Sequence, residues 1–354
     1  MERTPTVLDL FCGCGGISEG FRHAGFDIIG GIDFNEDATK TFQLNFKKAK
    51  VLCDDISNIN NRQIDDMFHG VDVIVGGPPC QGFSSANRHQ KEKDDPRNKL
   101  FFQYLRLVDI LKPQVIMIEN VRGLLTRDGG YAKERIGTLL TEMGYNVAMR
   151  VLCASDYGVP QNRYRAIIIG IKNGEKPFDF DIIKQKDKVT VEDAIGELYS
   201  FEQTNPEIKI LRERPSSDYR AYLRRKDNLV LDHDVVYPAK KVQARIHLVP
   251  QGGNWKDVPA ELWRTQRTNR HSSAYKRLKQ DDQSCTIDTG NAHSNYFHPL
   301  YDRIPSIRES ARIQSFPDSF EFVGSRGSKY KQVGNAVPPL MASAIATEIK
   351  KYLK

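Results

Sequence analysis

The sequence predicts an α/β protein with a doubly wound, mainly parallel sheet and a second, smaller and irregular domain. Three observations support this fold class. Apolar runs of strand length alternate with amphipathic stretches over the first half of the chain. Glycines follow the first apolar run, where a strand gives way to a helix. After Lys172 the periodicity weakens into polar sequence with scattered prolines and aromatic residues, up to about residue 305.

The order of the expected elements begins with a βαβ unit. A strand at 7–11 leads into glycines, the helical spacing after it ends at Gly25, and a second strand at 28–32 closes on Asp33. A third strand is expected just before Asp55. Further strands are expected at 71–75, 115–118 and 166–171, and they alternate with amphipathic stretches at 100–111 and 132–143. Helical spacing returns at 306–314 and 338–352, and the last helix is expected to pack against the first domain.

We therefore expect one domain from residues 1–172 plus 329–354, and a second domain with its hinge from residues 173–328. Composition limits the class of protein. Hydrophobic residues at 39% and charged residues at 27% are typical of a soluble globular chain, and no apolar run is long enough to span a membrane. We expect no export signal, because the apolar run at 7–11 is too short for one, and six cysteines lie scattered without C-x-x-C spacing. We expect no metal site, no disulfide framework and an intracellular protein.

Positive charge is concentrated in one segment. Residues 202–279 hold 17 basic and 9 acidic side chains, an excess of eight, while the whole chain has a net charge of +7. A local basic excess indicates a polyanionic partner, although a solvated, lysine-rich surface would give the same count.

The glycine turn after the first strand predicts a ligand site. Gly13 and Gly15 match the start of a G-x-G-x-x-G fingerprint, but Ser18 takes the third position, which lowers the case for a nicotinamide cofactor. Asp33 ends the second strand, where its carboxylate can accept from ribose hydroxyls, and Asp55 can accept from an adenine amino group. Together these features predict an adenosine pocket, although each is common for purely structural reasons.

A second group of residues predicts covalent chemistry at the same edge of the sheet. Cys80 follows the strand at 71–75 and two rigid prolines, Pro78 and Pro79. Glu119 ends the strand at 115–118, and Arg163 and Arg165 precede the strand at 166–171, where they can orient the acid or bind phosphate. The polar segment 83–98 is expected to form a movable lid. The structural alternatives are a buried core cysteine, a helix-capping acid and a surface ion pair.

In its order of motifs the chain resembles the DNA cytosine-5 methyltransferase family over nearly its whole length. DLFCGCGG at 9–16 is similar to the cofactor loop, PPCQ at 78–81 to the catalytic loop, ENV at 119–121 to the acid motif and QNRYR at 161–165 to the arginine motif. RESARIQSFP at 308–317 and QVGNAVPP at 332–339 are similar to the two C-terminal motifs. The ordered set is highly specific for this family.

The resemblance implies a Rossmann-like domain that binds S-adenosyl-L-methionine, and a target-recognition domain. It implies Cys80 as the nucleophile, Glu119 as the acid at cytosine N3, and Arg163 and Arg165 as further catalytic residues. The implied cofactor pocket consists of Phe11, Gly13, Gly15, Asp33, Phe34, Asp55, Ile56, Pro79, Leu100 and Asn335. Many relatives have Glu where Asp33 stands, and either carboxylate can bind ribose. Separately from the resemblance, candidate DNA contacts are Ser84 and Arg97 on the expected lid and the basic residues Arg264, Arg267 and Arg270, most of which would position the DNA backbone.

The chemistry requires a cytosine flipped out of duplex DNA, since a thiol cannot reach C6 of a stacked base. We further expect a monomer in the cytoplasm, associated with the nucleoid of a prokaryote, that protects DNA from a cognate restriction endonuclease. Two alternatives stay open: methylation of cytosine in transfer RNA, although the Cys-Phe-Thr tripeptide typical of those relatives is absent, and an inactive DNA-binding regulator. An amino-group methyltransferase would have an aromatic residue where Cys80 stands.

Overall fold

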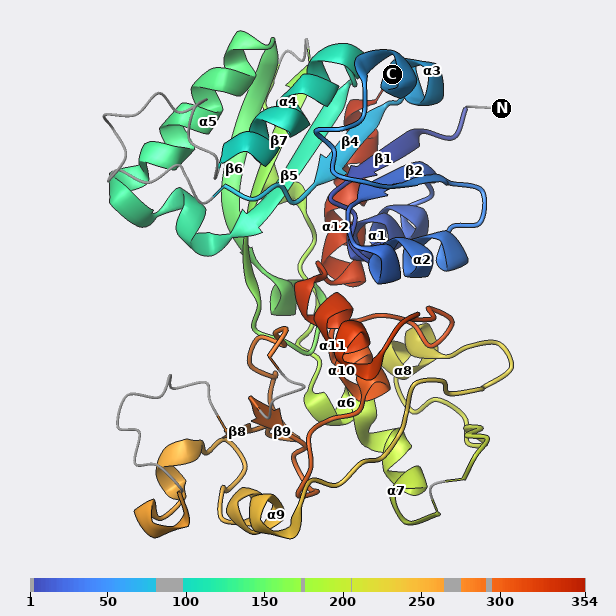
Figure 1. Cartoon of the computed structure of the whole chain (residues 1–354), viewed down its shortest axis with the longest axis vertical. Coiled ribbons are helices and arrows are strands. Elements are labelled where there is room, and N and C mark those ends of the chain that lie inside the picture. Colours follow the sequence, from blue (N-terminus) through green and yellow to red (C-terminus); the bar gives the residue numbers. More distant parts are fainter. Residues whose placement is uncertain are drawn as a thin grey trace. The chain divides into compact units, whose positions relative to one another are not determined.

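The computed structural model of the chain describes residues 3–80, 98–172, 176–204, 206–263, 275–290 and 295–353. Its main feature is a seven-stranded sheet of order β3-β2-β1-β4-β5-β7-β6 (Figure 1). The strands are β1 (Thr6–Leu10), β2 (Asp27–Asp33), β3 (Lys50–Cys53), β4 (Val73–Gly76), β5 (Val115–Val121), β6 (Tyr145–Cys153) and β7 (Tyr164–Lys172).

Strand direction sets the position of the functional edge. Neighbours among β1 to β5 pair in parallel, whereas β7 is antiparallel to both β5 and β6. The carboxyl ends of β1 to β5 therefore meet at one edge of the sheet, and β7 begins at that same edge. The expectation of a doubly wound, mainly parallel sheet is confirmed, and the antiparallel strand is its exception.

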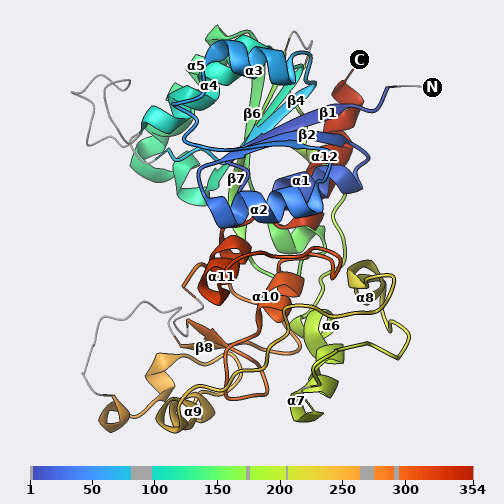
Figure 2. The same ribbon diagram turned by 45° about the vertical axis from the view of Figure 1, so that its right-hand side comes forward.

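Helices cover both faces of the sheet. Figure 2 shows α3, α4 and α5 on one face and α1, α2 and α12 on the other. Their bounds are α1 (Gly16–His23), α2 (Glu36–Asn45), α3 (Asn61–Phe68), α4 (Lys99–Leu111), α5 (Tyr131–Glu142) and α12 (Pro339–Ile349). Short 3-10 helices are η4 (Arg122–Leu125), η5 (Arg127–Gly130), η6 (Ala154–Tyr157), η7 (Phe180–Ile182) and η12 (Lys350–Tyr352). No described helix has the length and apolar character that a membrane crossing requires.

The last helix packs on the first part of the chain, as the sequence predicts. A Cβ atom on Gly20 of α1 would lie 2.5 Å from Cβ of Ala342 in α12. Such close approach requires a residue without a side chain. On the other face, apolar side chains of α3 and α4, such as Phe68 and Phe101, pack with strand residues into one buried cluster.

The chain divides into two compact units. The first consists of residues Met1–Tyr157, Tyr164–Gln185 and Val337–Lys354, and the second of Gly158–Arg163 and Lys186–Ala336. The second unit contains α6 (Val191–Ile195), α7 (Phe201–Thr204), α8 (Asp218–Leu223), α9 (Lys240–His247), α10 (Ile307–Ile313), α11 (Arg326–Asn335), β8 (Lys276–Arg277) and β9 (Tyr296–Phe297). Its 3-10 helices are η8 (Gly196–Ser200), η9 (Trp255–Asp257) and η10 (Ala260–Leu262). The functions expected for the ranges 1–172 with 329–354 and 173–328 stay a prediction.

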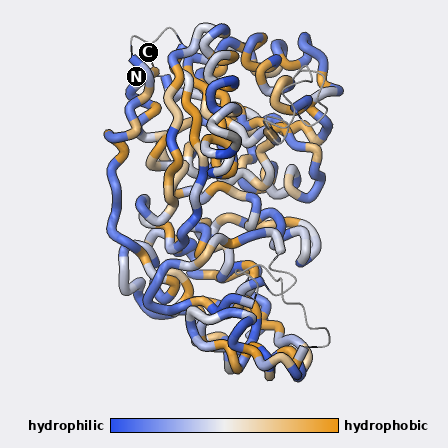
Figure 3. Tube along the Cα trace, turned by 90° about the vertical axis from the view of Figure 1, so that its left-hand side faces the viewer, coloured by the Kyte–Doolittle hydropathy of each residue, from blue (hydrophilic) through white to orange (hydrophobic). Residues whose placement is uncertain are grey.

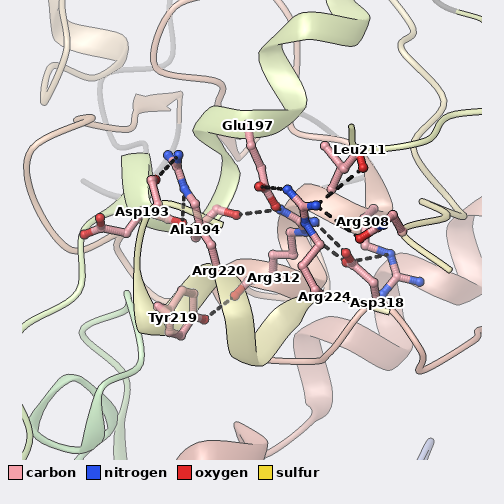
Figure 4. A network of polar contacts seen from close by, with 12 residues as sticks. Asp193, Ala194, Glu197, Leu211, Tyr219, Arg220, Arg224, Arg308, Arg312 and Asp318 are labelled. Carbon is pink, nitrogen blue, oxygen red and sulfur yellow. Dashed lines mark hydrogen bonds and ion pairs between the residues drawn. The ribbon is translucent and has the colours of Figure 1, made fainter. Parts of the chain in front are cut away.

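Buried polar contacts hold the second unit together. In Figure 3 the sheet strands are mainly hydrophobic, whereas hydrophobic stretches in the second unit are short. Figure 4 shows that Glu197 accepts from Nη1 of Arg312 at 2.7 Å and from Nη2 of Arg224 at 2.6 Å. Arg312 also pairs with Asp318, and Tyr219 donates to the Arg312 carbonyl at 2.6 Å. Such paired charges compensate their own desolvation and fix α8 and α10 relative to η8.

Candidate active site

An ion pair between an acid and an arginine lies at the carboxyl edge of the sheet. Nε of Arg165, at the start of β7, lies 2.6 Å from Oε1 of Glu119 in β5. Only 15% of the arginine side chain and 13% of the glutamate side chain is exposed. Nη1 of Arg165 also donates to the carbonyl of Tyr164 at 2.8 Å. The guanidinium is thus held on two sides, and it orients the Glu119 carboxylate.

The segment that leads to Cys80 passes directly beside this carboxylate. A Cβ atom on Gly77 would lie 3.1 Å from Oε2 of Glu119. Nδ2 of Asn120 donates to the Pro78 carbonyl at 2.9 Å, which ties the segment to β5. The structure therefore brings the two central residues of the predicted chemistry, Cys80 and Glu119, to one edge within one compact unit.

The Cys80 thiol is buried, with 6% of the residue exposed, and it donates to the Pro78 carbonyl at 3.3 Å. Burial, and then the negative charge of Glu119, raise the pKa of Cys80 to about 12. In this arrangement the thiol is protonated at neutral pH, and a nucleophilic thiolate requires a change in its surroundings.

The glycine turn after β1 has the backbone that an approaching ligand requires. Gly13 and Gly15 have φ angles of 52° and 99°, which favour glycine. A Cβ atom on Gly13 would meet nothing within 4 Å, whereas one on Gly15 would lie 2.6 Å from Cε2 of Phe46. The amide of Gly13 donates to Oδ2 of Asp33 at 2.9 Å. The turn therefore has open space at Gly13 beside a carboxylate, which fits an adenosine-containing cofactor.

Other predicted pocket residues lie near the ends of the same strands. Phe11, half-buried with a φ of 58°, follows β1, and Phe34 follows β2 with 73% of its surface exposed. An exposed aromatic ring of this kind offers a flat surface to a purine. Asp55 accepts from the amide of Ser57, and this bond lowers the pKa of its carboxyl group. Ile56 is buried, Pro79 is exposed and Leu100 is half-buried.

Asp9 is a residue that sequence reasoning missed. It lies within β1, is almost fully buried, and accepts from the Ser18 hydroxyl at 2.7 Å, while its Oδ1 has no described hydrogen-bond partner. Burial raises the pKa of Asp9 to about 7, and the negative charge of Asp33 adds to this. The hydrogen bond between Ser18 and Asp9 links α1 to β1, the two elements that the glycine turn connects. Ser18, which breaks the dinucleotide fingerprint, is the partner that this carboxyl group needs.

Two predicted residues belong to the second unit. Arg163 is fully buried and donates to the carbonyls of Ile287 and Gly334, both at 2.9 Å. These bonds brace the segment that ends in Asn335, an exposed residue at the end of α11. The arginine that pairs with Glu119 is Arg165, and a catalytic role for Arg163 stays a prediction.

The expected DNA contacts Ser84, Arg97, Arg264, Arg267 and Arg270 lie outside the described residues, as does nearly all of the expected lid. Among the described residues no group of His, Cys, Asp and Glu has the arrangement of a metal site.

The sheet order, the antiparallel β7 and the glycine turn beside an acid define a methyltransferase with a Rossmann-like fold. The family model for C-5 cytosine-specific DNA methylase matches residues 5–351. The chain therefore belongs to this family and is a DNA cytosine methyltransferase.

Named relatives and a solved structure agree with this assignment. The chain is 35% identical to the Type II methyltransferase M.DdeI of Desulfomicrobium norvegicum, over 98% of this chain and 89% of that protein. It is 34% identical to the Type II methyltransferase M1.HphI of Haemophilus parahaemolyticus, over 98% and 87% of the two chains. The crystal structure of a DNA modification methyltransferase encoded within an E. coli prophage superposes with a TM-score of 0.78 at 27% identity, over 98% and 99% of the two chains.

Proposed function

We propose that this enzyme transfers a methyl group from S-adenosyl-L-methionine to carbon 5 of a flipped-out cytosine in a specific duplex DNA sequence, with Cys80 as the covalent nucleophile. One observation carries the proposal. The Glu119–Arg165 ion pair lies beside Gly77, at the start of the segment that presents Cys80. An acid, a cation and a thiol at one edge of the sheet match the demands of attack on a pyrimidine ring.

Residues at the carboxyl ends of β1, β2 and β3 would hold the cofactor. The open space at Gly13 would admit it, the Asp33 carboxylate would accept from the ribose hydroxyls, and the exposed Phe34 ring would stack on adenine. Phe11, Asp55, Ile56, Pro79 and Leu100 would line the rest, and the part of Asn335 stays a prediction. When bound, S-adenosylmethionine supplies a methyl group on a positively charged sulfur, which an electron-rich carbon can attack.

Cys80 would make cytosine C5 electron-rich. Its sulfur forms a bond to C6, the C5–C6 double-bond electrons move towards C5, and Glu119 holds a proton at N3 as charge develops on the ring. Arg165 keeps the Glu119 carboxyl group oriented and contacts the base. The proton that the thiol loses would pass to the Glu119 carboxylate, which holds it at N3, and it would return from N3 to Glu119 when the sulfur leaves. The addition therefore needs no proton from solvent. After methylation a base, which we take to be water, removes the C5 proton, and the Cys80 sulfur leaves as the double bond re-forms.

The burial of Cys80 supports base flipping. With 6% of the residue exposed, its sulfur cannot approach a base within a stacked duplex. The cytosine must leave the helix, at a cost of a few kcal/mol that protein–DNA contacts offset.

The relatives named above are Type II methyltransferases. We propose accordingly that this enzyme protects DNA from a cognate restriction endonuclease, and that it acts as a monomer in the cytoplasm at the nucleoid.

A methyl-transfer assay tests the activity. The wild type should transfer labelled methyl groups to duplex DNA and not to transfer RNA, and sequencing of converted DNA from expressing cells should show methylcytosine at one recurring site. Cys80→Ala should abolish turnover. Cys153→Ala, which removes a buried thiol that contacts Ser155, is the matched control and should stay active. Full activity of Cys80→Ala, or transfer to transfer RNA alone, would refute the proposal.

A further inference from the structure

A second arginine and an aromatic ring lie beside the Glu119–Arg165 ion pair. β5 ends at Val121, which pairs with Arg165 of β7. The next residue of each strand end, Arg122 at the start of η4 and Tyr164 at the start of β7, lies at the same edge. The Cζ atom of Arg122 is 5.7 Å from the centre of the Tyr164 ring, so the guanidinium lies over the ring.

This pair is exposed although its neighbours are largely buried. Tyr164 and Val121 have 44% and 57% of their surfaces exposed, and Arg122 is exposed as well. No described acidic side chain forms an ion pair with Arg122. The active-site rim thus presents to solvent an aromatic ring, an apolar side chain and a cation, a combination that gains little for folding.

A guanidinium held over an aromatic ring is pre-oriented to bind an anion. The ring contact restricts the guanidinium, whose N–H groups have the fork geometry that matches two oxygens of a phosphate. We propose that Arg122, held by Tyr164, binds a backbone phosphate of the target DNA strand next to the flipped cytosine. This inference rests on the proposed function, because it takes duplex DNA with an everted base as the ligand.

A further cation, Arg127 at the start of η5, strengthens the charge of the rim. A Cβ atom on Gly123 would lie 2.8 Å from Nε of Arg127, so this exposed arginine folds over the turn that begins with Arg122. Two neighbouring cations, Arg122 and Arg127, favour a polyanion over a small neutral ligand.

The rim is also connected to the active site. The carbonyl of Tyr164 accepts from Nη1 of Arg165, the group that orients Glu119. A phosphate bound by Arg122 over the Tyr164 ring would therefore position the target strand relative to Glu119. Tyr164 is a positioning residue in this scheme and makes no chemical step.

The salt dependence of DNA binding tests the inference. Fluorescence anisotropy should follow the full-length protein on a labelled duplex that contains the site found by methylation sequencing, over a series of NaCl concentrations. The slope of log affinity against log salt decreases in magnitude by about 0.9 for each DNA phosphate that the protein no longer neutralises. Arg122→Ala and Arg122→Gln should both show this decrease and bind several-fold more weakly at low salt. Tyr164→Phe should resemble the wild type, and Tyr164→Ala should bind more weakly.

Arg62→Ala is the matched control, since it removes an equal charge from α3, where 92% of the arginine side chain is exposed. It should keep the wild-type slope. The inference is overturned if both Arg122 variants keep the wild-type slope, or if Arg62→Ala lowers it equally. If instead the wild type methylates no cytosine in DNA, the proposed function fails, whatever the slopes show.

Discussion

The acidity of the Cys80 thiol leads to a quantitative prediction for its reactivity. Burial and the charge of Glu119 raise the pKa of Cys80 to about 12. At pH 8 the thiolate fraction is then about 10⁻⁴, whereas an ordinary exposed thiol with a pKa near 8.5 has a thiolate fraction of about 0.2. Alkylation of Cys80 by iodoacetamide in the folded, DNA-free enzyme should therefore be slower by roughly three orders of magnitude than in the same chain unfolded in guanidinium.

The alkylation rate of Cys80 should also depend on pH. A thiol loses its proton as pH rises, so below its pKa the alkylation rate of Cys80 should increase about tenfold for each pH unit, with no plateau between pH 7 and 10. Glu119→Gln removes the nearby negative charge and should speed alkylation at every pH in this range. Peptide mapping by mass spectrometry separates Cys80 from the other five cysteines.

A Cys80 alkylation rate in the folded enzyme within tenfold of its rate in the unfolded chain at pH 8 would refute a buried, protonated thiol. A rate that levels off near pH 8.5 would also refute it, because such a plateau shows a thiol of ordinary acidity. Confirmation would mean that DNA binding itself must generate the thiolate.

Three further predictions concern stability and binding. The pKa of Asp9 is about 7 in the folded chain, against an ordinary value of 3.8. Its contribution to the free energy of unfolding is therefore fully present below about pH 4 and is lost as pH rises through 7, a decline of about 4 kcal/mol in total. Guanidinium unfolding of Asp9→Asn should lack this decline, and a decline equal to that of the wild type would contradict the assignment. Glu197→Ala should lower the free energy of unfolding by about 3–5 kcal/mol, because Arg224 loses its carboxylate partner and Arg312 keeps only Asp318. Asp227→Asn, from a more exposed pair, should cost less than about 1 kcal/mol. Gly13→Ala should lower the free energy of unfolding by roughly 1–2 kcal/mol, because its φ of 52° favours glycine. It should also lose affinity for S-adenosylhomocysteine in calorimetry, and unchanged affinity would remove Gly13 from the pocket.

The sequence predicts six of the seven strands of the sheet, but neither β6 nor the antiparallel direction of β7. The run 166–171 is apolar throughout because β7 lies between β5 and β6, and such a run has the same pattern in either direction. β6 escaped prediction because Tyr145–Cys153 mixes buried, half-buried and exposed positions at the edge of the sheet. It also begins three residues after α5 ends, with Gly144 as the single turn signal.

Motif spacing predicts the candidate site, and two neighbouring motif positions have different surroundings in the structure. Arg163 and Arg165 are two residues apart, but Arg165 reaches Glu119 while Arg163 donates to backbone carbonyls of the second unit. Residue type alone cannot distinguish the two arginines. β7 begins at Tyr164, between them, and this boundary decides that Arg163 belongs to the second unit and Arg165 to the first. Asp9 was hidden within an apolar strand, and its partner Ser18 counted only as a departure from a fingerprint.

The central claim is a covalent bond between Cys80 and cytosine, and a trapped complex tests it most directly. In a duplex whose target cytosine carries fluorine at C5, the last proton removal cannot occur, so the adduct should persist when the methyl donor is present. Mass spectrometry of digested complexes should find the nucleotide on the peptide that contains Cys80, and Cys80→Ala should trap nothing. An adduct on another residue, or complete turnover of the fluorinated duplex without a trapped complex, would contradict the account.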